Sequence, residues 1–584
     1  MRRLAVVLLL CASVLPAASA RATGERGAPG PPLPLESLFD NTAVSDDARP
    51  EEADFDGRGA SLPARDLAAA GWSPGRTLTV QGARLRWPDR APGEADNVVA
   101  DGQRVLLRGR GDALAFLVAG TAGRDVSGTG TVAYAGGGTS RYELTAPDWR
   151  RGPPATKAVA VPHVNTLCGQ LSERARLYVV TVPLPRGREV ASVTLPRAAG
   201  LHVFALSVRA TADGWTGSWA AATSGRPTVG PWTDRTLRLV VRASAGGERV
   251  RLRFDNTFAG TPVRIGRATV AVRGSGAAAA GTPAPVRFEG AAGVEIPAGA
   301  QAYSDPLAFA VPAGADLLVS FHLPGTVRAA PVHALALQRS YVSEPGDHTR
   351  DAAGTAYPGR LTSWPLLTGV DVGGGPGSVV AFGDSITDGD RSTVDANRRW
   401  PDVLAARLRA QDAVPRYGVL NQGIAGNRLL TDRYPGDGPS AAVTGVSALH
   451  RLDRDVFAQT GVRTVIVLEG VNDLLSGTDS DAVTDALEGI AGRAHARGLR
   501  VLGATLLPCG GRDGCTAAVE AERAAVNDWI RRTGVFDGVL DFDAVLRDPS
   551  APARLAPAYD SGDHLHPGDA GLAALARSVD LTAL

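Results

Sequence analysis

The chain has 584 residues, several times the size of a usual domain, so we expect two to four domains that each bury a core. Its acidic and basic residues nearly cancel and leave a formal net charge of +1 at pH 7. No overall field therefore favours nucleic acid, an anionic membrane or an acidic polymer, and any partner must be recognised by local sites.

Residues 1–20 have the form of a cleaved secretory signal peptide. Two arginines precede an apolar run, and small residues follow it, in "MRRLAVVLLLCASVLPAASARA". The run is short for a transmembrane span, and no later stretch is long and apolar enough to be one. We therefore expect a secreted, extracellular protein without a membrane span, and we expect it to be a monomer.

The two β regions are predicted from short alternating runs. Between residues 36 and 210, runs such as "RTLTVQGARLRW" and "LHVFALSVRA" are separated by Gly, Pro, Asp and Asn, which is typical of an all-β sandwich. A change of composition near residue 211 suggests a boundary. Residues 211–372 again look like β structure, so we predict a second, accessory β domain there.

The pattern changes after about residue 373. Short apolar runs such as "SVVAF" and "RTVIVLEG" alternate with segments of helical periodicity such as "WPDVLAARLRAQ" and "AVEAERAAVNDWIRRTG". Strand and helix in regular succession predict a doubly wound α/β/α domain over residues 373–584. In such sheets, ligands bind beyond the carboxyl ends of the strands.

Three cysteines remain once Cys11 leaves with the signal peptide. Cys509 and Cys515 bracket the loop "CGGRDGC", and in an oxidising compartment their proximity favours a local disulfide. The alternative is two free thiols, and this spacing is not a strong metal-binding pattern. Cys168 is then expected to be a small buried apolar residue.

Ser385 follows an apolar run in "VVAFGDSITDGD" and has two interpretations. With Asp388 three residues later it fits a helix-capping pattern, while a nucleophile would need a base and an anion hole. The base candidate is His566 in "YDSGDHLHPGDAG", with Asp563 placed to fix its tautomer. The alternative is an ordinary polar loop, and His564 competes for the role.

Two further strand ends carry candidate oxyanion donors. Gly426 in "VLNQGIAGNRLL" allows a close approach of the backbone to a ligand, and Asn472 in "VIVLEGVNDLL" offers a side-chain amide. The N–H of Ser385 would be a third donor. Both segments also fit simple turns, since Gly-Asn and Asn-Asp are favoured turn dipeptides.

These four segments occur in order, and together they resemble the SGNH hydrolase family, also called GDSL esterases and lipases. The matching stretches are "FGDSITDG", "NQGIAGNR", "LEGVND" and "DHLHP", within roughly residues 375–584. The resemblance implies a flavodoxin-like sheet and ester hydrolysis through an acyl-enzyme without a metal or organic cofactor. Ser385 would be the nucleophile, His566 the base and Asp563 its orienting acid. Ser385 N–H, Gly426 N–H and Asn472 Nδ2 would form the oxyanion hole.

The β regions resemble known modules less specifically. Residues 36–210 are similar to galactose-binding-like β-sandwiches attached to secreted glycosidases, which implies a carbohydrate-binding role, and residues 211–372 to a β domain that precedes some secreted GDSL hydrolases. Exposed tryptophans there would stack on sugar rings, although a buried core position is the simpler interpretation. The tryptophans concerned are Trp72, Trp87, Trp149, Trp215, Trp219 and Trp232.

An acidic cluster in the first β region is a candidate for structural calcium, because this ion prefers oxygen ligands, although a solvated acidic loop is the alternative. Its members are Asp40, Asp46, Asp47, Asp54 and Asp56.

Together with the signal peptide, these resemblances imply a secreted serine esterase that removes acyl groups, acetyl groups in particular, from O-acylated carbohydrate. A lipase, lysophospholipase or broad short-chain esterase would use the same machinery. A non-catalytic glycan-binding protein is the alternative from another class.

Overall fold

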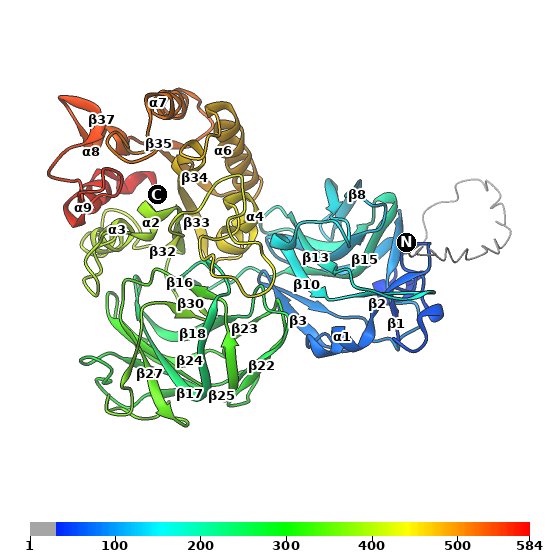
Figure 1. Ribbon diagram of the computed structural model, residues 1–584. Helices are drawn as coiled ribbons and strands as arrows, with labels where there is room; N and C mark the ends of the chain where they lie inside the picture. The colour runs from blue at the N-terminus through cyan, green and yellow to red at the C-terminus, as the bar shows by residue number, and fades with distance from the viewer. Residues whose placement is uncertain (1–30) are drawn as a thin grey trace, which may run out of the picture.

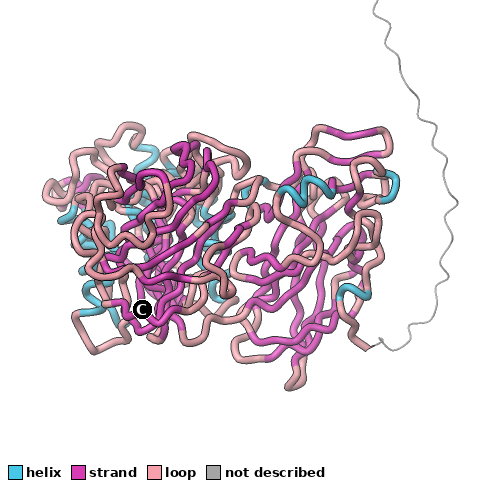
Figure 2. The backbone as a smooth tube through the Cα atoms, turned by 90° about the horizontal axis from the view of Figure 1, so that it is seen from below, coloured by secondary structure: helices cyan, strands magenta, loops and turns pink. Residues whose placement is uncertain are grey.

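The computed structural model describes residues 31–584. The predicted signal peptide at residues 1–20 lies outside the described residues. The three parts of the chain are visible in Figure 1, with the first β domain near the label N, the second β domain below, and the α/β domain above it. Both β domains consist of strands joined by loops, with few helical turns (Figure 2).

The first β domain is a sandwich of two antiparallel sheets, flanked by a small third sheet. The five-stranded sheet has the order β10 (Lys157–Val161), β13 (Ala175–Pro183), β7 (Ala113–Gly120), β15 (Arg197–Arg209), β5 (Val98–Asp101). The four-stranded sheet has the order β6 (Arg104–Arg110), β14 (Glu189–Thr194), β8 (Val126–Tyr134), β9 (Thr139–Ala146). The small sheet contains β1 (Val44–Ser45), β2 (Ala60–Pro63), β11 (Val164–Thr166), β12 (Gly169–Leu171). The one α-helix among these strands, α1 (Ala64–Ala69), breaks the purely β pattern expected from the sequence.

The second β domain is also a two-sheet sandwich, but one of its sheets borrows a hairpin from the earlier region. This sheet contains β16 (Trp215–Ala220), β30 (Leu367–Gly373), β18 (Gly247–Asp255), β23 (Gln301–Tyr303), β3 (Thr77–Val80), β4 (Ala83–Arg86), with β24 (Leu307–Val311) beside β18. The facing sheet contains β21 (Ala284–Val286), β20 (Arg267–Val272), β25 (Asp316–Ala329), β17 (Thr228–Arg242), β27 (Ser340–Pro345), β28 (Gly359–Leu361). Two short pairs complete it, β19 (Val263–Ile265) with β22 (Val294–Ile296) and β26 (Val332–His333) with β29 (Trp364–Pro365).

The hairpin β3–β4 belongs by sequence to the predicted range 36–210 but pairs with β23 of the second domain through Thr79 and Gln301. One apolar cluster therefore extends from the second β domain onto the five-stranded sheet of the first, while the space between the two sheets of the first domain holds a separate cluster. The predicted boundary near residue 211 falls in the gap between β15 and β16.

The α/β domain has one parallel sheet of five strands. Its order is β32 (Gly418–Gly423), β31 (Ser378–Gly383), β33 (Val462–Leu468), β34 (Arg500–Ala504), β35 (Gly538–Leu540). In chain order this is 2-1-3-4-5, the flavodoxin-like arrangement, so the doubly wound fold is confirmed. Strand β31 is buried at every position, as an apolar strand covered on both faces must be.

Helices cover both faces of this sheet. α3 (Trp400–Arg409) packs against α9 (Asp569–Ser578), and α6 (Ser480–His495) packs against α7 (Ala517–Arg532) (Figure 1). The shorter elements are α2 (Ser385–Asp388), α4 (Ala448–Leu452), α5 (Val471–Leu474), α8 (Phe542–Leu546), β36 (Arg547–Asp548) and β37 (Ala551–Leu555). None of the helices in residues 31–584 combines the length and apolar character that crossing a membrane requires.

Both β domains contact the α/β domain. The edge strand β16 packs against the edge strand β32, and the Gly217 backbone N–H donates to Ser378 Oγ at 2.9 Å. From the first β domain, Thr181 Oγ1 donates to Asp453 Oδ1 at 2.8 Å. The three domains therefore meet in direct side-chain contact rather than through a free linker.

Candidate active site

The predicted nucleophile, base and orienting acid lie together. Ser385 begins the one-turn helix α2 directly beyond β31, and its Oγ is 2.8 Å from His566 Nε2. On the other side of the ring, His566 Nδ1 is 2.7 Å from Asp563 Oδ2. A carboxylate only accepts, so Nδ1 carries the proton and Nε2 is left as the acceptor for the Ser385 hydroxyl. The geometry is that of a serine nucleophile beside an oriented base.

The Asp563 carboxylate is fixed by several donors. Its Oδ1 accepts the backbone N–H groups of Leu565 at 3.1 Å and His566 at 2.9 Å. Arg391 Nε donates to Oδ2 at 3.2 Å. Burial alone would raise the pKa of Asp563, but the backbone and side-chain hydrogen bonds from His566 outweigh it and lower the pKa below its usual range. Asp563 is therefore held as a carboxylate facing the imidazole.

The helix-capping role that the sequence suggests for Ser385 is taken by its neighbour, Asp384. Asp384, not Ser385, is the N-cap of α2, because its Oδ1 accepts the Ile386 backbone N–H at 2.9 Å. Its other oxygen has no hydrogen-bond partner, and burial raises the pKa of Asp384 to about 6. The Ser385 hydroxyl is thereby released from capping and faces His566.

The two predicted oxyanion donors follow the strands on either side of β31. Gly426 lies beyond β32 and has φ +75°, a left-handed conformation that suits glycine. Asn472 lies beyond β33, and its Nδ2 donates to the Asn427 carbonyl at 2.9 Å. Because carboxyl ends of parallel strands meet at one edge, these groups flank the nucleophile, and their roles stay predictions.

A buried arginine joins the three strand ends. Arg451 has no exposed side-chain surface and donates to the carbonyls of Gly383 at 2.9 Å and Gln422 at 2.7 Å. It also contacts Asn427 Oδ1 at 2.8 Å and Glu469 Oε1 at 3.0 Å. Burial is the main cause that raises the pKa of Glu469 well above its usual range. Arg451 therefore sets the spacing of β31, β32 and β33 where the site forms.

The rim of the site is polar. His564, the competing base candidate, bonds Asp560 Oδ2 through Nδ1 at 2.6 Å and is half exposed, so it is not paired with Ser385. Asp390 Oδ2 lies 3.8 Å from His566 Nε2 and its side chain is 33% exposed. A carboxylate at this distance can accept hydroxyl groups of a substrate beside the reacting bond.

The predicted disulfide between Cys509 and Cys515 is present. Cys509 packs with Val471, the neighbour of Asn472, and with Leu565, the neighbour of His566. The bridged loop therefore backs two of the candidate site segments.

The exposure of Cys168 and of the six tryptophans of the β domains can be compared with what the sequence predicts. Cys168 is exposed beside the β11–β12 turn, which corrects the prediction of a buried residue; its segment forms a hairpin of mostly exposed residues. All but one of the six tryptophans are buried, and the remaining one, Trp215, is flanked by Arg249 and Arg251. These side chains therefore offer no open stacking face for a sugar ring.

The aspartates proposed as calcium ligands accept backbone N–H groups in the first β domain and do not gather around one point. Asp54 and Asp56 accept backbone N–H groups of Gly59 and Arg58, and Asp40 accepts that of Val99. Within residues 31–584, no three of the cluster's carboxylates bring their oxygens within 4.8 Å of one another. The arrangement lends no support to a calcium site.

Sequence reasoning missed Arg451, Asp390 and Arg391. None lies in a pattern that marks it: Arg451 lies in the short helix α4, far along the chain from Ser385, and the other two follow α2, the turn that begins with Ser385. Only the folded arrangement shows their contacts.

The parallel sheet, the Ser385–His566–Asp563 contacts and the flanking strand ends define the C-terminal domain as an esterase-class hydrolase. Residues 381–574 match the GDSL-like Lipase/Acylhydrolase family, so this part of the chain is a GDSL-like hydrolase domain. Residues 30–212 match the AziU2-like beta-sandwich domain. No curated protein matches the chain.

Several solved structures are similar to part of the chain. They include a member of the lipolytic protein G-D-S-L family from Veillonella parvula, with 18% identity, 34% of this chain and 94% of that one covered, and a TM-score of 0.25. A GDSL-like lipase from Bacteroides thetaiotaomicron has 18% identity, 35% and 87% coverage and a TM-score of 0.26. A catalytic mutant of an acetylxylan esterase from Geobacillus stearothermophilus has 20% identity, 34% and 91% coverage and a TM-score of 0.26.

Proposed function

We propose that the protein is a secreted serine esterase that hydrolyses carboxylic esters through an acyl-enzyme, with O-acetylated carbohydrate as the substrate class. The observation that carries this proposal is the 2.8 Å contact between Ser385 Oγ and His566 Nε2, with Asp563 on the far side of the ring. Residues 1–20 have the sequence features of a secretory signal peptide, which supports export.

The reaction follows from these contacts. Ser385 Oγ bonds to the ester carbonyl carbon while His566 Nε2 takes its proton, and Asp563 stabilises the resulting imidazolium. The carbonyl oxygen becomes an oxyanion that accepts hydrogen bonds from the Ser385 and Gly426 N–H groups and from Asn472 Nδ2. Collapse breaks the bond to the alcohol oxygen, which leaves with the proton of His566. A water molecule then repeats the sequence on the acyl-enzyme and releases the acid and Ser385.

A polar rim supports a hydroxylated alcohol over a lipid. Asp390 is close enough to the reacting centre to accept hydrogen bonds from hydroxyl groups next to the ester, and Arg391 beside it is half exposed. Charged groups at the rim disfavour a long acyl chain, which would have to desolvate them. A binding role for the β domains on sugar would need contacts other than tryptophan stacking.

The test is kcat/KM on nitrophenyl esters from acetyl to palmitoyl, followed by acetate release from an O-acetylated polysaccharide. Ser385→Ala is the blank and should lose turnover while keeping its thermal unfolding midpoint. A sharp preference for acetyl supports the carbohydrate esterase. A preference for long chains would favour the lipase alternative, and Ser385→Ala with the wild-type rate would overturn the assignment of the nucleophile.

A further inference from the structure

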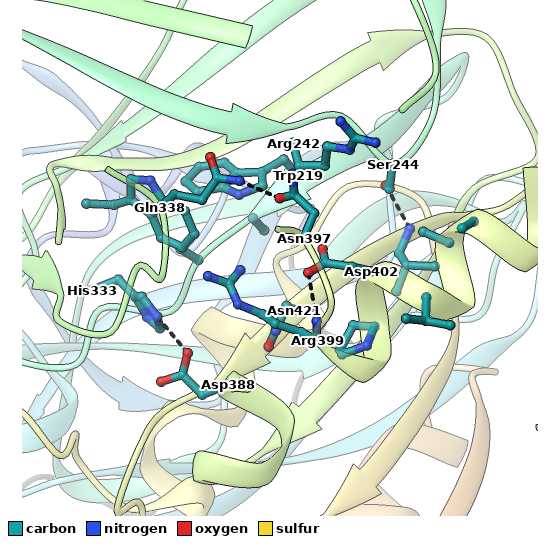
Figure 3. Close-up of a pocket in the computed structure, with 18 of the residues that line it drawn as sticks. Trp219, Arg242, Ser244, His333, Gln338, Asp388, Asn397, Arg399, Asp402 and Asn421 are labelled. Atoms are coloured by element: carbon teal, nitrogen blue, oxygen red, sulfur yellow. Dashed lines mark hydrogen bonds and ion pairs between the residues drawn. The ribbon is translucent and has the colours of Figure 1, made fainter. Parts of the chain in front are cut away.

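The second β domain and the hydrolase domain enclose a cavity of about 140 Å³ behind the catalytic turn (Figure 3). His333, at the end of β26, and Asp388, the last residue of α2, face each other in its wall and interact across the domain boundary. His333 Nε2 lies 3.0 Å from Asp388 Oδ1, and both side chains are at least 95% buried. A buried contact between a histidine and a carboxylate from two domains needs a physical reason.

The surroundings of His333 favour a doubly protonated ring. Nδ1 lies 2.9 Å from the Ala222 carbonyl, while Nε2 faces the Leu335 carbonyl at 3.3 Å as well as Asp388. The two carbonyls only accept, and an ionised Asp388 does too, so this arrangement matches a ring with hydrogen on both nitrogens. Burial lowers the pKa of His333 and Arg399 opposes its charge, but Asp388 and the Ala222 carbonyl outweigh them and raise the pKa. His333 is thus an imidazolium paired with a carboxylate.

The second oxygen of Asp388 reaches the predicted oxyanion loop. Asp388 Oδ2 accepts the backbone N–H of Ala425 at 2.8 Å, and Ala425 immediately precedes Gly426. Asp388 also ends the helix that begins with Ser385. One carboxylate therefore connects His333 to both the nucleophile's turn and the loop that presents the Gly426 N–H.

We propose that His333 is a positioning residue for ester hydrolysis: it holds the Asp388 carboxylate in place, and Asp388 holds the Ala425–Gly426 backbone in the orientation that the oxyanion needs. The proposal rests on the proposed function. Under this proposal the second β domain contributes directly to catalysis through His333. The physical basis is that a buried carboxylate without its cation turns or takes up a proton, and a donor displaced by about 1 Å can cost about 100-fold in rate.

The test compares His333→Ala with His322→Ala. His322 is a matched control because its Nε2 also pairs with an aspartate, Asp234 Oδ1 at 2.7 Å, in the same domain. We expect kcat on nitrophenyl acetate to fall about tenfold or more in His333→Ala, with KM within about twofold, because the oxyanion forms only in the transition state. The His322→Ala enzyme should keep the wild-type kcat. Equal rates in both variants would overturn the proposal.

A double-mutant cycle separates positioning from general destabilisation. Asp388→Asn combined with His333→Ala should be no slower than the worse single variant, because both act through one contact. His333→Gln, whose amide can donate to Asp388, should recover part of the lost kcat, and it carries the test if His333→Ala does not fold. Independent effects that multiply, or no recovery by Gln, would count against the contact.

The pH profile of kcat gives a readout that a structural role would not move. Because the pKa of His333 is raised, its contact with Asp388 is present below about pH 6.5 and is lost as the pH rises through the folded-state pKa. The charged groups that face His333 are Asp388 and Arg399, and only Asp388 contacts the oxyanion loop. Wild-type kcat should therefore fall on the alkaline side, and His333→Gln should lack this limb.

Amide hydrogen exchange tests the position of the Ala425 backbone without requiring any enzymatic activity. The Ala425 amide should be protected in the wild-type protein and in His322→Ala, and exposed to exchange in His333→Ala. If wild type hydrolyses no ester, the proposed function fails, while this exchange result still decides whether His333 holds the loop. Unchanged protection in His333→Ala would overturn the inference alone.

Discussion

Asp563→Asn should cost more activity than Asp563→Ala. In the wild-type protein Oδ1 of Asp563 accepts two backbone N–H groups, at 2.9 and 3.1 Å, while Oδ2 faces His566 Nδ1 at 2.7 Å. An asparagine has one oxygen for these two directions. The backbone donors cannot change, but the imidazole can move its proton, so the oxygen will face the backbone and the NH₂ group will face His566 Nδ1.

That orientation makes Nδ1 an acceptor and places the proton on Nε2, which can no longer take the proton of Ser385. We expect kcat to fall by about 10³- to 10⁴-fold, equivalent to about 4–5.5 kcal/mol of transition-state stabilisation. Asp563→Ala imposes no donor on Nδ1, and the ring keeps access to the productive tautomer. It should therefore remain at least about tenfold more active than the Asn variant.

The assay is steady-state kcat and KM on nitrophenyl acetate near neutral pH, with thermal unfolding to show that both variants are folded. Ser385→Ala supplies the background rate. An Asn variant that keeps more than about a tenth of wild-type kcat, or that equals the Ala variant, would refute the tautomer argument.

Three further predictions concern the supports of the site. Arg451→Met should lower the free energy of unfolding of the hydrolase domain by about 3–5 kcal/mol, because buried Glu469 loses its cation; a change below about 1 kcal/mol in denaturant unfolding would contradict this. Gly423→Ala should lower kcat about tenfold or more, since its Cβ would lie 2.1 Å from a backbone nitrogen of α2, and an unchanged rate would show that the turn adapts. Replacing Cys509 and Cys515 together by Ala should cost about 2 kcal/mol of stability by loop entropy, with reduced wild-type protein as the comparison.

Much of the hydrolase domain is predictable because its signals are local. Buried strands such as β31 are uninterrupted apolar runs, and Ser385, Gly426 and Asn472 each lie in a short stretch after such a strand. His566 lies in a polar stretch just before the last helix, α9. The order of those stretches along a doubly wound sheet brings them to one edge. The contacts among Ser385, His566 and Asp563 therefore agree with what their sequence positions suggested.

The remaining features depend on pairings that no local pattern encodes. The alternation in β3 and β4 predicts a hairpin, but does not say that β23, more than two hundred residues later, will accept it. His333 is an isolated histidine in a β-rich stretch, and its partner lies 55 residues away in another domain. Cys168 was expected to be buried on residue type alone, whereas its hairpin lies on the surface.

The contact between β16 and β32 limits how the hydrolase domain could be separated from the rest of the chain. Strand β32 is the terminal strand of the hydrolase sheet, and β16 covers its outer side. An uncovered edge of a parallel sheet presents unpaired backbone groups and invites association with other chains. A hydrolase domain excised at residue 374 should therefore be prone to self-association, and exchanging it between proteins would require a new shield for that edge, such as charged side chains on β32.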